Sequence, residues 1–249
     1  LPTSMADVQS RYQAIPYGWK EIDIAYVAAM LIYQQKVTIK YGGATIQPDN
    51  PKLPDMLRKK SEIGKTSISK RQVVTAAKMK AVKEIMRDYF DMMSVPDDED
   101  GLVREIKKKF GEQKEHFDAL DGMYGKNSHY PDHAVVANGL TIVNSILSQD
   151  KDNIALIDRV LTEEDALFEN KEKMQKVEGF FKNQVQVFDT ASQLVNDLRN
   201  ELDYLSKEEE ANNALNQIRL ITMTDHGFDY MKIPTLNDLI RTVHEGHDR

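Results

Sequence analysis

The first third of the chain is organised around residues 16–47, which read PYGWKEIDIAYVAAMLIYQQKVTIKYGGATIQ. Apolar residues recur at a helical period over 19–35, in a stripe that is wide for a single helix. The period then changes to two over 36–40. Gly42-Gly43 supplies two residues that tolerate positive φ, and residues 44–47 return as a second strand. This stretch therefore predicts a helix followed by a β-hairpin.

The residues after the hairpin continue this organisation. Two prolines, at positions 51 and 54, mark a loop and the start of a short helix over 53–60. Alternating side chains at 66–73 indicate a third strand, and the apolar spacing over 75–92 predicts a helix. This succession is typical of a winged-helix-like unit, or of a small α+β module whose sheet is covered on one face by helices. We assign the module to residues 1–95, and the pattern leaves both architectures open.

The rest of the chain, beyond an acidic turn at 97–100, has the pattern of helices throughout. We expect helices over 100–119, 132–149, 151–168, 170–205, 208–223 and 234–245, and the longest loop at 121–131. Apolar residues at 170–205 recur every three or four positions, which favours packing within the chain over a groove for a partner. The expected fold class is mainly α, with a small α+β, winged-helix-like N-terminal module and an acidic, all-helical domain at 96–249.

Composition limits the function. With 249 residues, 41% of them hydrophobic, the chain can bury a sizeable core in one or two domains. The absence of cysteine excludes disulfides, thiolate catalysis and cysteine-ligated metals, and it fits a reducing cytoplasm. No apolar run is long enough to cross a membrane and no signal-peptide pattern is visible, so we expect a cytoplasmic location and no membrane partner. The first residue is Leu1 and the first methionine is Met5, which favours a cloned or excised domain.

Basic residues are concentrated in one segment of an otherwise acidic chain. The net charge is −7, yet residues 58–83 hold nine basic residues and a single acid, Glu62. Such a segment can neutralise DNA phosphates without reading base sequence, it can be an ordinary solvated face, or it can dock on the acidic helical part or on a partner subunit. The candidate DNA-binding residues are Arg58, Lys59, Lys60, Lys65, Lys70, Arg71 and Lys78.

Motifs for catalysis or nucleotide binding are weak. Gly64-Lys65-Thr66 resembles the end of a phosphate-binding loop, but the glycine that such a loop needs five residues earlier is Lys59. We therefore interpret the tripeptide as a turn. The acidic clusters at 97–100 and 162–165 lie near predicted helix starts, where carboxylates offset the helix dipole. The chain also lacks a Gly-x-Ser-x-Gly nucleophile motif, so we predict no catalytic residues, no bound cofactor and no enzyme activity for it.

Two histidine pairs have spacings at which a helix could present both rings to one metal ion. These are His129 with His133 and His244 with His247. Pro131 lies inside the first pair, the second lies at the C-terminal end beside Gly246, and no third ligand is evident. We predict no metal site.

The strongest identity signal is the motif Tyr17-Gly18-Trp19, with Asp23 in the helix that follows. Together with the hairpin at Tyr41-Gly42-Gly43 and the helical remainder, it resembles the C-terminal region of the large P-loop proteins of the bacterial BREX phage-defence system, of the BrxC/PglY type. For the four motif positions we expect a structural role, in which the rings anchor the first helix against the core of the module.

The resemblance implies a function for a part of a larger protein. The chain would be a non-catalytic accessory region of a large P-loop ATPase, scaffolding or coupling within a multiprotein assembly for phage restriction and DNA modification. ATP and Mg²⁺ would bind N-terminal to this region. The implied partners are other BREX subunits or a second copy of the chain. The alternative is a DNA-binding winged-helix module that holds duplex DNA through residues 58–83.

Overall fold

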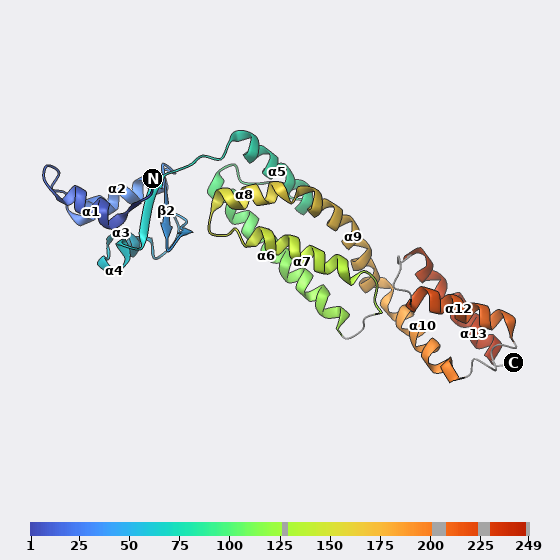
Figure 1. The fold of residues 1–249 in the computed structure, drawn as a ribbon. Coiled ribbons are helices and arrows are strands. Elements are labelled where there is room, and N and C mark those ends of the chain that lie inside the picture. Colours follow the sequence, from blue (N-terminus) through green and yellow to red (C-terminus); the bar gives the residue numbers. More distant parts are fainter. Residues whose placement is uncertain (126–128, 201–207, 224–229, 248–249) are drawn as a thin grey trace. The chain divides into compact units, whose positions relative to one another are not determined.

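The computed structural model describes residues 1–125, 129–200, 208–223 and 230–247 (Figure 1). These residues form two compact units. The first combines residues 1–112 with 143–164, and the second combines residues 113–142 with 165–249. The small sheet belongs to the first unit.

The first unit opens with a four-stranded antiparallel sheet. Its strands are β1 (Thr3–Ser4), β2 (Val37–Tyr41), β3 (Ala44–Thr45) and β4 (Thr66–Lys70), in the spatial order β1-β4-β2-β3. The predicted hairpin is confirmed, because β2 and β3 pair across Gly42 and Gly43, whose φ angles are 55° and 86°. The predicted third strand is also confirmed, since β4 pairs with β2 along five residues.

Four helices pack with this sheet: α1 (Met5–Gln13), α2 (Glu21–Tyr33), α3 (Leu53–Arg58) and α4 (Lys60–Ile63) (Figure 1). The sequence pattern predicts α2 and α3, but it does not predict β1 or α1. The reason is that β1 is two residues long and α1 buries only Met5 and Gln9. The Ser4 side chain accepts a hydrogen bond from the amide of Asp7 and so caps α1.

The core of this module lies on one face of α2. Ile24, Ala25, Ala28 and Ile32 are buried there, and they belong to one apolar cluster with residues of α1, β2, α3 and α4. The other face of α2 is exposed, although it is equally apolar. The wide apolar stripe in the sequence therefore covers two faces with different surroundings.

The helical part of the first unit consists of α5 (Ala76–Phe90), α6 (Glu99–Tyr124) up to residue 112, α7 (His133–Leu147) from residue 143, and α8 (Asn153–Thr162). The predicted apolar face of α5 is largely buried, at Val82, Ile85 and Met86. The rings of Tyr89 and Phe90 contact Phe110 of α6 at centroid distances of 6.0 and 4.9 Å.

The second unit includes α9 (Glu164–Asn183) from residue 165, α10 (Val185–Asp197), α12 (Glu209–Met223) and α13 (Leu236–His247), with short 3-10 turns at Leu198–Asn200 and Tyr230–Thr235. Its apolar stripe packs within the unit, as predicted. Phe180, Phe188, Val195 and Leu198 share one buried cluster with residues of α12 and α13.

Several predicted helix boundaries are wrong, among them the start predicted at residue 170, which lies at Glu164. Helix α6 extends to Tyr124, so the predicted loop at 121–131 starts later. The helix predicted at 151–168 ends at Thr162, and the one predicted at 170–205 is interrupted at Gln184. Residues 201–205 of that prediction lie outside the described residues.

Candidate interaction surfaces

The basic segment 58–83 is largely neutralised within the chain. Six of its nine cations lie within 4 Å of a carboxylate, in the pairs Arg58–Glu21, Lys59–Asp55, Arg71–Glu99 and Asp100, Lys78–Asp158, Lys80–Glu84, and Lys83–Asp97. Among the described residues, Lys60, Lys65 and Lys70 make no such pair. The dense positive charge of this stretch in the sequence therefore does not produce an equally dense positive charge on the surface.

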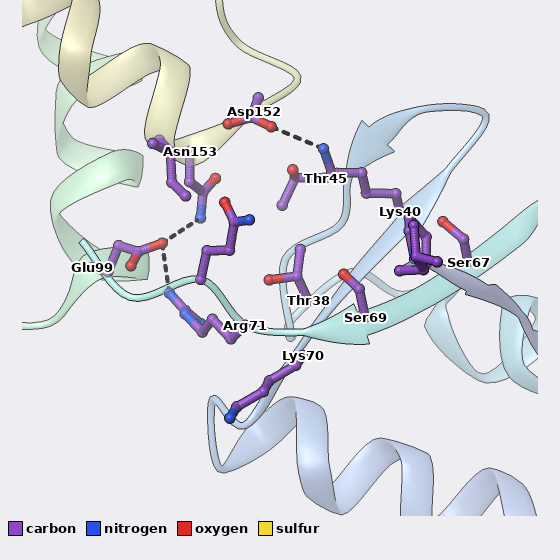
Figure 2. A pocket seen from close by; sticks show the side chains of 14 residues that line it. Thr38, Lys40, Thr45, Ser67, Ser69, Lys70, Arg71, Glu99, Asp152 and Asn153 are labelled. Carbon is purple, nitrogen blue, oxygen red and sulfur yellow. Dashed lines mark hydrogen bonds and ion pairs between the residues drawn. The ribbon is translucent and has the colours of Figure 1, made fainter.

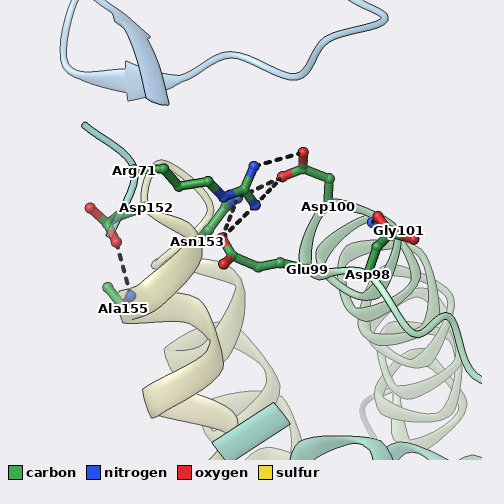
Figure 3. Close-up of polar contacts among 8 residues, drawn as sticks. All are labelled: Arg71, Asp98, Glu99, Asp100, Gly101, Asp152, Asn153 and Ala155. Carbon is green, nitrogen blue, oxygen red and sulfur yellow. Dashed lines mark hydrogen bonds and ion pairs between the residues drawn. The ribbon is translucent and has the colours of Figure 1, made fainter. Parts of the chain in front are cut away.

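Among these ion pairs, those of Arg71 form a buried cluster (Figure 3). Arg71 follows β4 directly. The guanidinium donates Nη1 to Asp100 Oδ2 at 3.1 Å and Nη2 to Asp100 Oδ1 at 2.9 Å, and Nη2 also lies 2.9 Å from Glu99 Oε1. Asn153 Nδ2 donates to the same two carboxylates, at 3.3 and 3.2 Å. Glu99 begins α6 and Asn153 begins α8, so the cluster joins the end of the sheet to the starts of two helices.

Burial makes this cluster energetically important. The Arg71 side chain is 10% exposed and that of Asp100 is 7% exposed. Burial by itself would lower the pKa of Arg71, but the hydrogen bonds and negative charges of Asp100 and Glu99 outweigh it and raise that pKa above the ordinary value. The guanidinium therefore remains charged, and it compensates two carboxylates that have little access to water.

A second polar connection lies nearby, between β2, β3 and the start of α8. Lys40 Nζ donates to Asp152 Oδ2 at 2.8 Å, and the Asp152 side chain also caps α8 by accepting from the amide of Ala155 at 3.0 Å. The amide of Thr45 donates to the carbonyl of Lys151 at 2.8 Å. Burial opposes ionisation of Asp152, but its hydrogen bonds with Lys40 and with backbone amides keep the pKa of this carboxyl below the ordinary value.

These two connections border a polar cavity of about 560 Å³ (Figure 2). Hydroxyl groups of the sheet line one side, and the side chains of Glu99, Asp152 and Asn153 lie opposite; the sheet residues are Thr38, Thr45, Ser67 and Ser69. The Oδ1 atom of Asn153 is buried without a hydrogen-bond partner in the described part of the chain. Three cations, Lys40, Lys70 and Arg71, and two acids, Glu99 and Asp152, line the cavity, and the ion pairs Lys40–Asp152 and Arg71–Glu99 join them.

An apolar groove, hereafter the Trp19 groove, lies between α1, α2, β2 and β4. Its volume is about 320 Å³, and its lining includes Tyr12, Trp19, Val27, Leu31, Val37 and Ile68. Trp19 stacks on Tyr12 with ring centroids 5.2 Å apart and an angle of 24° between the planes. Trp19 is 41% exposed, so part of it remains open to solvent, and the anchoring role expected for it stays a prediction.

The apolar surface continues from the groove onto the outer face of α2. Ile22, Tyr26, Val27, Met30 and Tyr33 are between 40% and 80% exposed. A helix with apolar residues on all sides is normally buried on all sides, and a contiguous exposed apolar patch commonly marks an interaction site. The sequence carries this signal, because the thirteen residues of α2 contain no charge after Asp23.

Tyr17, Gly18 and Asp23, the other positions of the family motif, lie just before or within the first turn of α2. Gly18 adopts a φ of 62° in the turn before Trp19, Tyr17 contacts Tyr12 at 5.0 Å, and Asp23 is exposed in the first turn of α2. Gly64 and Lys65 form a turn between α4 and β4, as predicted, whereas Thr66 of the predicted turn is the first residue of β4.

The histidines of the two pairs have different surroundings. His133 Nε2 lies 2.6 Å from Asp121 Oδ1, and its ring stacks on Tyr124 at 4.3 Å. His244 and His247 lie in the last turn of α13. Within the described residues, no group of three or more histidine, aspartate or glutamate side chains is arranged to hold a metal ion. In the same residues, no helix is both long and apolar enough to cross a membrane.

Two protein-family models match the chain over adjacent ranges. Residues 1–72 match the winged helix-turn-helix domain of the BREX ATP-binding protein BrxC, and residues 78–202 match its alpha helical domain. The chain belongs to the BrxC family. This match decides between the two architectures left open by the sequence, in favour of the winged helix. No solved structure matches the chain.

The two BrxC models also describe the organisation of the chain. The winged-helix match ends immediately after Arg71, and the helical match begins two residues after α5 starts at Ala76. Both are accessory domains, and no catalytic domain is matched. The predicted boundary between residues 95 and 96 stays a prediction.

Proposed function

We propose that this BrxC region is a non-catalytic interaction module, which docks another BREX subunit on the exposed apolar surface of its winged helix. The exposed face of α2 carries the proposal, because five large apolar side chains there face solvent. Fully burying one such side chain contributes about 1.5–3 kcal/mol, so a partner that covered several of them would gain substantial binding energy. Membership of the BREX system makes its other components the natural partners.

The same region is suited to couple its two domains. The Arg71 cluster and the Lys40–Asp152 pair connect the winged helix with the first turns of α6 and α8. Buried polar networks with specific geometry hold elements in one arrangement, because leaving any member without its partner is costly. Through these contacts, a partner docked on α2 would act on the helical domain as well.

The docking proposal can be tested with a matched pair of substitutions. Met30 is 40% exposed on the proposed surface, whereas Met93 is fully exposed after α5. Met30→Asp should weaken association with a purified BREX subunit, measured by sedimentation velocity, by about tenfold or more, since a charge would be placed in an apolar interface. Met93→Asp should leave it unchanged. Equal association of both variants would contradict the proposal, and sedimentation of the chain alone tests self-association in the same way.

Duplex DNA binding is the second candidate, favoured by the exposed cations Lys60, Lys65 and Lys70, which have no acidic partner among the described residues. Fluorescence anisotropy of a labelled duplex at about 50 and 200 mM salt measures such phosphate contacts. This candidate would be supported if binding fell steeply with salt, and if Lys60→Glu and Lys65→Glu weakened binding equally for different DNA sequences. Absence of binding at the lower salt concentration would exclude it. Arg71 is left intact because its charge belongs to the buried cluster.

A further inference from the structure

The Trp19 groove has the dimensions and the residue spacing of a helix-binding site. The α2 residues that line it, Ile24, Val27, Ala28 and Leu31, follow the spacing i, i+3, i+4, i+7. They extend over roughly 10 Å of helix axis, at about 1.5 Å per residue. Val8 and Tyr12 of α1 form the opposite wall, also one helical turn apart. Grooves of this kind bind amphipathic helices through apolar side chains at the same repeat.

Four basic residues, hereafter the rim cations, line the groove or adjoin its lining residues in the sequence, although the chain as a whole is acidic. Lys70 lines the groove itself, and Arg11, Lys20 and Lys36 are direct sequence neighbours of the lining residues Tyr12, Trp19 and Val37. All four cations are exposed, and none forms an ion pair with another described residue.

Three acids lie on α1 and α2, the helices that line the groove, and Glu21 is the one that pairs with a cation among the described residues. Glu21 pairs with Arg58 at 3.4 Å. Asp7 accepts a hydrogen bond from the Ser4 hydroxyl at 2.7 Å, while Asp23 is exposed and makes no ion pair in the described part of the chain. The groove therefore combines an apolar floor with a local excess of positive charge, because the four rim cations outnumber the two acids, Asp7 and Asp23, that lack a cationic partner among the described residues.

We propose that the Trp19 groove binds an acidic amphipathic helix of a partner protein. Apolar side chains of this helix at i, i+3 or i+4, and i+7 would enter the groove, and flanking aspartate or glutamate side chains would face the rim cations. The inference rests on the proposed docking function and specifies the partner's chemistry. A nucleic acid would satisfy the rim but would leave the apolar floor without a complementary surface.

The test uses the emission of Trp19, which is the only tryptophan in the chain and lines the groove. The probe is a capped helical peptide of about four turns with leucine at the anchor positions and glutamate beside them. We expect a saturable blue shift of Trp19 emission, and a Kd at least tenfold lower than for the same peptide with lysine in place of glutamate. No shift, or equal affinity for the two peptides, would overturn the proposal.

Two further probes separate the apolar from the electrostatic contribution. A peptide that keeps glutamate but replaces leucine by alanine, and a DNA duplex, are polyanions without apolar anchors. Both should bind at least tenfold more weakly than the leucine–glutamate peptide. If either binds as tightly as that peptide, the groove is a general polyanion site, and the proposal of a helix partner fails.

Variants of the chain locate the binding site. Val27→Asp should abolish the response to the leucine–glutamate peptide, whereas Val73→Asp, at a residue that is 80% exposed and does not line the groove, should retain it. The double variant Lys20→Glu, Lys36→Glu should reverse the preference and favour the lysine peptide. An unchanged preference in this folded variant would contradict the role of the rim.

Failure of the acidic-helix proposal can be told apart from failure of the proposed docking function. If Met30→Asp weakens association with a BREX subunit while the peptide series shows no charge preference, the docking function stands and the acidic-helix inference is overturned. If the leucine–glutamate peptide binds and Val27→Asp abolishes both peptide and subunit binding, the two proposals are supported together.

Discussion

The first unit carries two sets of basic residues that differ in what surrounds them, and Lys70 of the second set lies within the segment 58–83 of the first. The set in 58–83 is dense in the sequence, but most of its charges pair with carboxylates of the same chain. The set around the Trp19 groove, Arg11, Lys20, Lys36 and Lys70, is scattered in the sequence and unpaired among the described residues.

This difference shows that charge clustering in a sequence is a poor guide to charge on a surface. Arg71 and Lys83 pair with carboxylates at or just before the start of α6, where acids are favoured by the helix dipole or as caps, and Lys78 pairs with Asp158 within α8. Those cations contribute to the fold. The groove cations have no such partners and remain available to a ligand.

The largest expected effect concerns Arg71, the cation of the segment 58–83 whose ion pairs are buried. Arg71→Met would leave the carboxylates of Glu99 and Asp100, which are 11% and 7% exposed, without their cation. Breaking a buried pair in this way costs about 3–5 kcal/mol of unfolding free energy. Urea unfolding followed by circular dichroism measures it.

The control for this prediction is Lys80→Met, which also removes one positive charge from the same segment. Lys80 lies 3.9 Å from Glu84 and is 79% exposed, so the change in stability should stay within about 0.5 kcal/mol. If the two variants lost similar stability, the distinction between internal and surface cations in this segment would be wrong.

The two faces of α2 provide a second comparison between adjacent residues. Ile32 is 3% exposed and Tyr33 is 80% exposed. Ile32→Ala should cost about 2–5 kcal/mol, because it removes buried methyl groups and leaves a cavity. Tyr33→Ala should change stability by less than about 0.5 kcal/mol. Thermal unfolding of both variants checks this, and a large loss for Tyr33→Ala would show that the outer face of α2 is covered within the chain.

The smallest expected effect is the pH dependence of the Lys40–Asp152 pair, whose side chains are 35% and 42% exposed. The pKa of Asp152 is lower in the folded chain than its ordinary value of 3.8. The stability that the carboxylate contributes is therefore complete above about pH 5, and it is lost as pH falls through the lowered pKa.

Asp152→Asn isolates this charge, since asparagine keeps the capping function. The difference in urea midpoint between the original chain and the variant should be constant from about pH 7 to 5 and should shrink below about pH 4. A difference that grew on acidification would have the opposite sign and would show that burial, and not the ion pair, controls Asp152.

The local elements of the fold follow from the sequence because their signals are local. Gly42 and Gly43 specify the hairpin turn, and the apolar spacing in α5 and α9 identifies the buried faces. The helix breaks at Glu163 and Gln184 contain neither glycine nor proline, so the residue types there do not signal them in the sequence.

The candidate site is less accessible to sequence reasoning. Trp19 and the apolar excess of α2 are visible in the sequence, but the exposure of one face depends on where α1 and the sheet pack. The rim cations form no sequence pattern, because positions 11, 20, 36 and 70 lie in four separate segments of the chain. Conversely, the acidic partners of Arg71 and Lys78 lie 28 to 80 positions further along the chain.

Hydrogen–deuterium exchange of this BrxC region, alone and mixed with each of the other BREX proteins in turn, tests the central claim most directly. We predict that one of these proteins protects backbone amides in α2 and in residues 12–20, and leaves residues 58–65 unchanged. Protection confined to residues 58–65, or no protection by any BREX protein, would contradict the assignment of the Trp19 groove and the outer face of α2 as the interaction surface.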